Sequence, residues 1–302
     1  MRDLFEEIWS NIRRNKLRTA LTGFAVAWGI FMLIFLLGAG NGLIHALESN
    51  NSDYMTNTMN VWGGYTSKPY NGMREGRRID LNDKDIDITI GPDFADNVEK
   101  AGTILTQASL TTSYGKEYIV KQVSGVSPEY SEMNKLSLLY GRFINEIDIK
   151  ERRRVIVMDS NDARELLGVT GEKEEGLTAL QKAAAAEALV GKYVKINSSM
   201  FQVIGILRPN ENGWSSLYAP ITTIRTIYNR GKEIDEYTFS FHGLDSEEEN
   251  RVFEDRLRAS LNKNHNAAPD DKSAVGIWNI LTMNMEMNKG MLMIRTALWI
   301  IG

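Results

Sequence analysis

The chain is 302 residues long, with 43% hydrophobic residues, 25% charged residues and a formal net charge of −4. A mildly acidic chain has no excess of positive charge to attract a polyanion, so we expect no nucleic acid partner. The absence of cysteine excludes disulfides, thiol catalysis and thiolate metal sites. A chain of this length has room for two domains.

Residues 1–18 combine apolar and charged side chains at helical spacing. The apolar side chains are Leu4, Phe5, Ile8, Trp9 and Ile12. This pattern predicts an amphipathic helix at the cytoplasmic surface of a membrane, with Trp9 at the level of the headgroups. A cytosolic helix packed on a partner protein is the alternative.

Residues 19–47 are predicted to form a transmembrane helix that extends into a stalk. From Thr19 to Ile44, 26 residues contain no Asp, Glu, Lys, Arg or His. A helix of that length reaches about 39 Å, which exceeds the ~30 Å hydrocarbon core. A secretion signal has a shorter apolar region, and a buried core helix is seldom apolar on every face. We therefore expect the lipid bilayer to be a partner.

Positive charge before the span predicts its orientation. The basic residues Arg13, Arg14, Lys16 and Arg18 precede it, whereas the first Lys or Arg after it is Lys68. The positive-inside rule places the N-terminus in the cytoplasm and the residues after about 45 outside it.

The soluble middle predicts an α+β fold in which strands and helices are mixed. In residues 48–125 we expect strand and turn from Val61, a short helix capped by Asn82, and two strands within 103–126 joined at residues 114–116. Read from Asp83, the acidic stretch superficially resembles a calcium loop. It lacks the glycine at position 6 and the glutamate at position 12, so the capped helix is the better interpretation.

Residues 126–234 are predicted to form a small α+β lobe inserted in the first. The expected elements are a helix over 128–136, a strand over 155–158, a helix capped by Ser160 or Asn161, an alanine-rich helix near Gly176, a hairpin over 191–209 and a helix from about Thr222. Residues 235–274 complete the first lobe with a strand and a helix capped by Asp245 or Ser246, whose apolar face comprises Val252, Phe253, Leu257 and Leu261.

Residues 275–302 are predicted to form a stalk and the start of a second transmembrane helix. The 12 residues from Met291 to the last residue are too few to cross a bilayer, which needs about 20. We expect Leu43 and Leu47 to pack against the apolar stalk residues Ile277, Ile280 and Leu281. The methionines between 283 and 293 suit helix packing better than copper(I), because residues two apart on a helix point in different directions.

No catalytic or cofactor motif is present. The sequence has no G-x-x-x-x-G-K-[ST] loop and no G-x-S-x-G elbow. Its three histidines, His45, His242 and His265, lack metal-ligand spacing. We therefore expect no catalytic residue, no metal ligand and no cofactor.

Four segments, in order, resemble the permease subunits of MacB/FtsX-type ABC transporters, the mechanotransmission class. They are "NIRRNKLRTALTGFAVAWGI", "YGRFINEIDIKERRRVIVM", "LVGKYVKINSSMFQVIGIL" and "LYAPITTIRTIY". The resemblance identifies the middle of the chain as a MacB-like periplasmic core domain. It assigns structural roles to the motif residues Gly141, Arg142, Arg153, Arg154, Gly191 and Gly205.

The resemblance implies a non-catalytic permease subunit of the bacterial inner membrane, with its main domain in the periplasm. It implies a second permease subunit in a dimer, and a separate cytoplasmic ABC ATPase that hydrolyses ATP. It also admits a periplasmic adaptor and an outer-membrane duct. Such subunits transmit ATP-driven motion for export or release of peptides, antibiotics or lipoproteins, or to activate cell-wall enzymes. The sequence does not identify the substrate or a substrate-binding residue.

Two other functions fit the same layout. A membrane-anchored sensor would have an extracytoplasmic domain that feeds a cytoplasmic kinase or cyclase. A membrane-anchored periplasmic hydrolase would need a cleft with converging acids.

Overall fold

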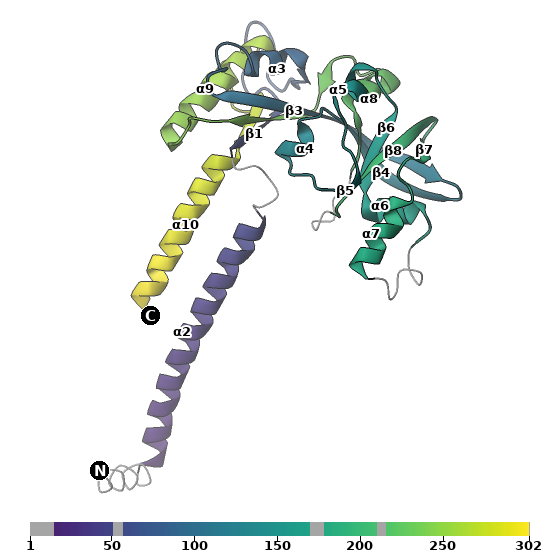
Figure 1. Cartoon of the computed structure of the whole chain (residues 1–302). Coiled ribbons are helices and arrows are strands. Elements are labelled where there is room, and N and C mark those ends of the chain that lie inside the picture. The colour runs from purple at the N-terminus through teal and green to yellow at the C-terminus, as the bar shows by residue number, and fades with distance from the viewer. Residues whose placement is uncertain (1–14, 51–56, 170–177, 210–215, 302) are drawn as a thin grey trace. The chain divides into compact units, whose positions relative to one another are not determined.

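The computed structural model of the chain describes residues 15–50, 57–169, 178–209 and 216–301. The chain divides into two units, which Figure 1 shows together. The helical unit comprises residues 1–52 and 284–302, and the mixed unit comprises residues 53–283.

The helical unit contains α2 (Lys16–Asn50) and most of α10 (Ile280–Ile301). Apolar side chains of α2 are open to the surroundings on all sides: Leu21 is 62% exposed, Phe24 65%, Ile30 56% and Phe35 62%. Among the described residues, one helical segment, Lys16–Phe35, is long and apolar enough to cross a membrane. The N-terminal apolar helix is thus confirmed. The second span, on α10, stays a prediction.

The mixed unit is built on one ten-stranded sheet in the order β12-β1-β11-β3-β4-β9-β6-β8-β5, with β7 pairing β3 and β8 (Figure 1). Its strands are β1 (Thr58–Gly63), β3 (Val98–Tyr114), β4 (Glu117–Val126), β5 (Leu138–Gly141), β6 (Val155–Asp159), β7 (Tyr193–Ile196), β8 (Ser199–Leu207), β9 (Leu217–Pro220), β11 (Glu236–Phe241) and β12 (Val275–Asn279). The short strands β2 (Leu81–Asn82) and β10 (Glu233–Ile234) pair with each other. The mixed α/β fold class is confirmed.

Among the described residues of this unit, seven helices pack on the sheet or at its ends. They are α3 (Asp83–Thr89), α4 (Tyr130–Met133), α5 (Glu146–Lys150), α6 (Ser160–Leu166), α7 (Ala179–Glu187), α8 (Ile221–Tyr228) and α9 (Glu247–Asn264). Helices α3 and α9 lie on one face of the sheet near β1 and β3 (Figure 1).

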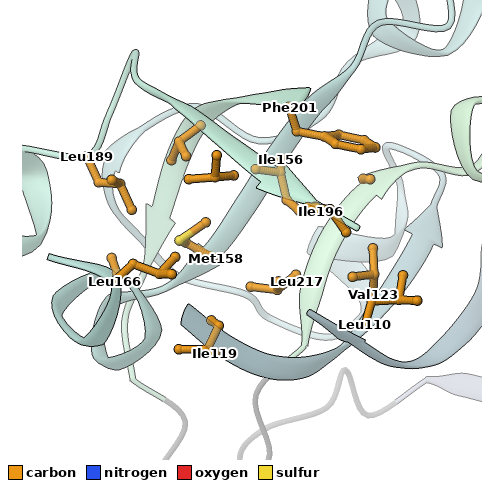
Figure 2. Close-up of a cluster of buried hydrophobic side chains, with 14 of the residues drawn as sticks. Leu110, Ile119, Val123, Ile156, Met158, Leu166, Leu189, Ile196, Phe201 and Leu217 are labelled. Carbon is orange, nitrogen blue, oxygen red and sulfur yellow. The ribbon is translucent and has the colours of Figure 1, made fainter. Parts of the chain in front are cut away.

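Two large hydrophobic clusters stabilise the mixed unit. The Phe239 core draws its residues from 59–98 and 234–275, and includes Met59, Phe239 and Leu257. The Ile156 core, shown in Figure 2, draws its residues from 105–224. Each fully buried Leu, Ile or Phe side chain in these clusters contributes roughly 1.5–3 kcal/mol.

The long strand β3 takes part in both clusters. Val98 lies in the Phe239 core, whereas Leu105 and Leu110 of the same strand lie in the Ile156 core. Ile119 and Val123 of β4 also pack in the Ile156 core. The expected lobe boundary at residues 125–126 stays a proposal, and the apolar side chains of the β3–β4 hairpin pack with the inserted segment.

Most local predictions in the mixed unit are confirmed. Asn82 caps α3 in a capping box with Asp85, and Ser246 caps α9 with Glu249. The β3–β4 and β7–β8 hairpins lie where they are expected. Residues 1–14 of the expected interfacial helix, Arg13 and Arg14 with them, lie outside the described residues, as does Gly176.

Three local predictions are wrong. The cap of α6 is Asp159, whose side chain accepts from the Asn161 amide at 2.6 Å, and not Ser160 or Asn161. Val252 is 48% exposed, because it lies about 100° around α9 from Phe253 and leaves the buried face. Residues 275–279, expected as stalk, form strand β12, which pairs antiparallel with β1.

Candidate functional site

The point where the mixed unit continues into α10 is held by a polar network around Asn279, which we call the α10 joint. Asn279 is 5% exposed. Its Nδ2 donates to Asn250 Oδ1 at 2.7 Å and to Glu254 Oε1 at 2.9 Å. Its Oδ1 accepts from the Thr282 amide at 3.2 Å, as the side chain of a helix N-cap does. One side chain therefore connects β12, the first turn of α10, and α9.

Helix α9 presents a polar stripe to this joint. Asn250, Glu254 and Arg258 are spaced by four residues, which places them on one face of the helix. Arg258 Nε donates to the Val275 carbonyl at 3.4 Å, and its Nη1 donates to Asp255 at 2.9 Å. The stripe therefore binds β12 at both ends of the strand.

The joint satisfies groups that would be costly to leave unpaired. The buried Asn250 also donates to the carbonyls of Leu244 and Ser246, each at 2.8 Å, which fixes its orientation. Burial raises the pKa of Glu254 above its ordinary value, and the hydrogen bond from Asn279 opposes that effect. The network ties β12 and the first turn of α10 to α9, and all of its residues belong to the mixed unit.

A second cluster, around Asp148, contains two of the residues assigned to family motifs, Arg142 and Arg153. The Asp148 carboxylate is fully buried and accepts from Arg142 Nη2 at 3.0 Å, while Arg153 lies 3.7 Å away. Asp148 also closes the capping box of α5 with Asn145. Burial alone would raise the pKa of Asp148, but the hydrogen bonds from Arg142 and Asn145 hold it below its usual value. Sequence reasoning missed Asp148, although the N-x-x-D capping signature was visible.

Gly141 and Gly205 allow two strands to approach closely beside this cluster. Gly141 has φ +78°, and a Cβ there would lie 2.2 Å from the Ile204 carbonyl oxygen. A Cβ on Gly205 would lie 2.3 Å from the Arg142 carbonyl oxygen. Gly191 and Arg154 lie beside the middle of β8, where the Gly191 amide donates to the Val203 carbonyl and the Arg154 carbonyl accepts from the Gln202 amide. These residues position backbone, and nothing in their geometry resembles a catalytic arrangement.

The residues expected in the stalk fall in different places. Ile277 lies on β12, and Ile280 and Leu281 begin α10; Ile277 and Leu281 pack against the Phe239 core. Leu43 and Leu47 belong to α2, and their side chains lie outside the described ones. Their pairing with α10 stays a prediction. Of the residues expected to orient the span, Lys16 and Arg18 lie exposed at the start of α2.

Within the part of the chain that the structure describes, no group of three or more His, Asp or Glu side chains is placed to hold a metal ion. The superficially calcium-like acids are used otherwise. Asp85, which is fully buried, accepts from the Asn82 amide at 2.8 Å, from Asn264 Nδ2 at 2.9 Å, and lies 2.8 Å from His265 Nε2. Asp85 therefore stabilises the start of α3 and its contact with the C-terminal end of α9, while Asp83 pairs with Arg225 of α8.

A family model described as the MacB-like periplasmic core domain matches residues 19–257. The chain belongs to this family. MacB-like proteins are also its relatives in sequence. The "Macrolide export ATP-binding/permease protein MacB" of Psychrobacter arcticus is 27% identical over 224 residues, which cover 70% of this chain and 30% of the relative. The protein of the same name from Neisseria meningitidis serogroup A is 24% identical over 215 residues.

Two solved structures share the MacB-like fold. The periplasmic region of MacB from Actinobacillus actinomycetemcomitans superposes with a TM-score of 0.57 at 20% identity, covering 79% of this chain and 96% of that one. The extracellular domain of the noncanonic ABC-type transporter YknZ from Gram-positive bacteria gives 0.55 at 20% identity, covering 74% and 100%. The chain spans about a third of the length of the curated MacB relatives.

The family match ends within α9, at residue 257. Asn250 and Glu254 therefore lie inside the matched MacB-like segment, whereas Asn279 and α10 lie beyond it. The α10 joint connects the matched core to the helix that follows.

Proposed function

We propose that this chain is part of the permease subunit of a MacB-type ABC transporter. In this proposal the mixed unit lies outside the cytoplasm, α2 crosses the inner membrane with its N-terminus inside, and α10 begins a second crossing. The subunit acts as a dimer and carries no active site of its own. A separate cytoplasmic ATPase hydrolyses ATP, and α2 and α10 transmit the resulting motion to the mixed unit.

One observation supports this function above the others: the first turn of α10 is tied through Asn279 to α9, a helix that begins inside the matched MacB-like segment. Transmission through α10 needs a firm attachment at its first turn, and the two hydrogen bonds that Asn279 donates and the one that it accepts supply it. The exposed apolar surface of α2 supports the membrane location, since such a surface is unfavourable in water.

The division into two lobes is part of the proposal. The Phe239 core uses residues from both ends of the mixed unit, and the Ile156 core uses the segment between them. We propose that transported molecules are export substrates related to those of the macrolide exporters, released from the outer side of the membrane. A periplasmic adaptor and an outer-membrane duct would then complete the path.

The absence of cysteine makes a direct test possible. Lys116→Cys, in the β3–β4 turn, should react with a membrane-impermeant maleimide in intact spheroplasts, whereas Ser10→Cys should react only after permeabilisation. A spin label at Lys116→Cys should then report an ATP-dependent distance change between the two copies of the assembled transporter. Reversed labelling would overturn the orientation. An unchanged distance with an active ATPase would overturn mechanical transmission.

A further inference from the structure

Glu236, a carboxylate at the start of β11, lacks a polar partner among the described residues. Glu236, on β11, is partly buried, and among the described residues its side chain has no hydrogen-bond or ion-pair partner. The adjacent Asp235 is different: it accepts from the Thr106 amide at 2.7 Å and lies 3.5 Å from Arg230. Burial, reinforced by repulsion from Asp235, raises the pKa of Glu236. A partly desolvated, unpaired carboxylate is costly unless a donor from elsewhere meets it.

The strand register places an aromatic residue on one side of Glu236 and an aliphatic residue on the other. Trp62 on β1 is directly opposite Glu236 on one side, and Ile104 on β3 is directly opposite on the other. Trp62 is in turn opposite Gly276, where an added Cβ would lie 2.3 Å from the indole ring, so the ring lies across that glycine. Trp278 follows two residues later and therefore points to the same face. Trp62 and Trp278 are each 40% exposed.

We propose that Glu236, Trp62 and Trp278 bind the ammonium group and apolar body of a water-soluble amphiphilic amine. The carboxylate is complementary to the positive charge, and indole faces attract organic cations. A metal ion does not fit, because a single carboxylate flanked by indoles offers too few hard ligands. The inference rests on the proposed export function and adds a substrate class to it.

The test uses the full chain labelled with 5-fluorotryptophan in a neutral maltoside detergent. The chain has six tryptophans, and Trp62→Phe and Trp278→Phe assign two of the fluorine resonances. The probe is benzyltrimethylammonium, and the neutral comparator is benzyl alcohol. We expect the cation to shift both assigned resonances saturably, and benzyl alcohol to bind at least tenfold more weakly. Glu236→Gln, which keeps the side-chain shape, should weaken binding of the cation at least tenfold.

Matched controls separate this site from general effects. Glu75→Gln removes an exposed carboxylate elsewhere and should leave the affinity unchanged. Equal binding of both probes, or an unaltered affinity in Glu236→Gln with a native-like fluorine spectrum, would overturn the inference. Resonance shifts that follow protein concentration would assign the face to a second copy. Shifts produced by phosphatidylethanolamine nanodiscs alone would assign it to lipid, and either result overturns the proposal. Because binding is measured without transport, its failure leaves the proposed function standing.

Discussion

Replacement of Asn279 by leucine tests the α10 joint directly. Leucine has a similar volume but can neither donate to Asn250 and Glu254 nor accept from the Thr282 amide. The buried Asn250 oxygen then loses its donor, at a cost of about 1–3 kcal/mol. Loss of the cap at the start of α10 adds about 0.5–2 kcal/mol. Leucine recovers part of this through added apolar burial, so we expect the free energy of unfolding to fall by about 2–3 kcal/mol.

The assay is urea denaturation of the full chain in detergent, followed by circular dichroism. Asn288→Leu is the matched control, because Asn288 is exposed on the same helix and the chemical change is identical. That variant should stay within about 0.5 kcal/mol of the parent. Asn279→Asp separates the two roles of the side chain: it keeps the cap but loses the donors and faces Glu254 with a second negative charge. Parent-like stability of Asn279→Leu would refute the reasoning.

In the assembled transporter the same variant should uncouple motion from ATP hydrolysis. The ATPase rate should stay within about twofold of the parent, because Asn279 lies in the mixed unit, which in this proposal is outside the cytoplasm. The ATP-dependent distance change between spin labels at Lys116→Cys should shrink. If the ATPase rate and the distance change fall in proportion, the α10 joint stabilises the fold but does not transmit motion.

Four further predictions use other contacts. Asp148→Ala should lower the free energy of unfolding by about 2–3 kcal/mol in denaturation, since it removes a buried carboxylate that accepts from the half-exposed Arg142 and closes the capping box of α5; a loss below about 1 kcal/mol would contradict this. Gly205→Ala should lower the free energy of unfolding by about 1–3 kcal/mol in the same assay, because the added methyl group meets the Arg142 carbonyl oxygen. An unchanged free energy of unfolding would contradict this and would mean that the backbone beside β5 can shift at little cost. Glu254→Gln should become increasingly stable relative to the parent as pH rises. Because the pKa of Glu254 is raised in the folded state, the folded parent holds its proton more tightly than the unfolded chain, and the parent loses stability between the ordinary glutamate pKa and the raised one. A stability difference that stays constant when unfolding is measured across this pH range would refute it. Leu47→Cys with Leu281→Cys should crosslink if the stalk pairing is right, and neighbouring registers should be tried before it is rejected.

Local chemistry explains which elements could be predicted. The caps at Asn82 and Ser246 depend on side chains within three residues, and the hairpin turn at Gly115 depends on the turn itself. The predicted cap of α6 lies one or two residues beyond the observed one, because Asp159, Ser160 and Asn161 are all residue types that favour the N-cap position. The extended backbone angles of Asp159 make it the cap.

Contacts between distant residues explain most of what could not be predicted. Asn250 and Asn279 are 29 residues apart in sequence, and an asparagine side chain does not indicate which distant residue it will bond. Strand β12 had a usable signal, since V-G-I-W-N is rich in β-branched and aromatic residues, but its place in the sheet depends on pairing with β1. The lack of a partner for Glu236 could not be predicted from the sequence, because it depends on the face of the sheet to which β11 directs the side chain.

The continuous sheet bears on how motion could cross the mixed unit. An insertion in sequence suggests two lobes that move independently, yet the single strand β3 carries side chains of both cores. β3 pairs with β11 on one side and with β4 on the other, and only β1 separates β11 from β12. A displacement imposed on β12 at the α10 joint would therefore reach the Ile156 core through backbone hydrogen bonds. Register shifts interrupt that ladder between Ser240 and Phe241 in the β11–β3 pair and between Gln107 and Leu110 in the β3–β4 pair, and bending should concentrate at these two points.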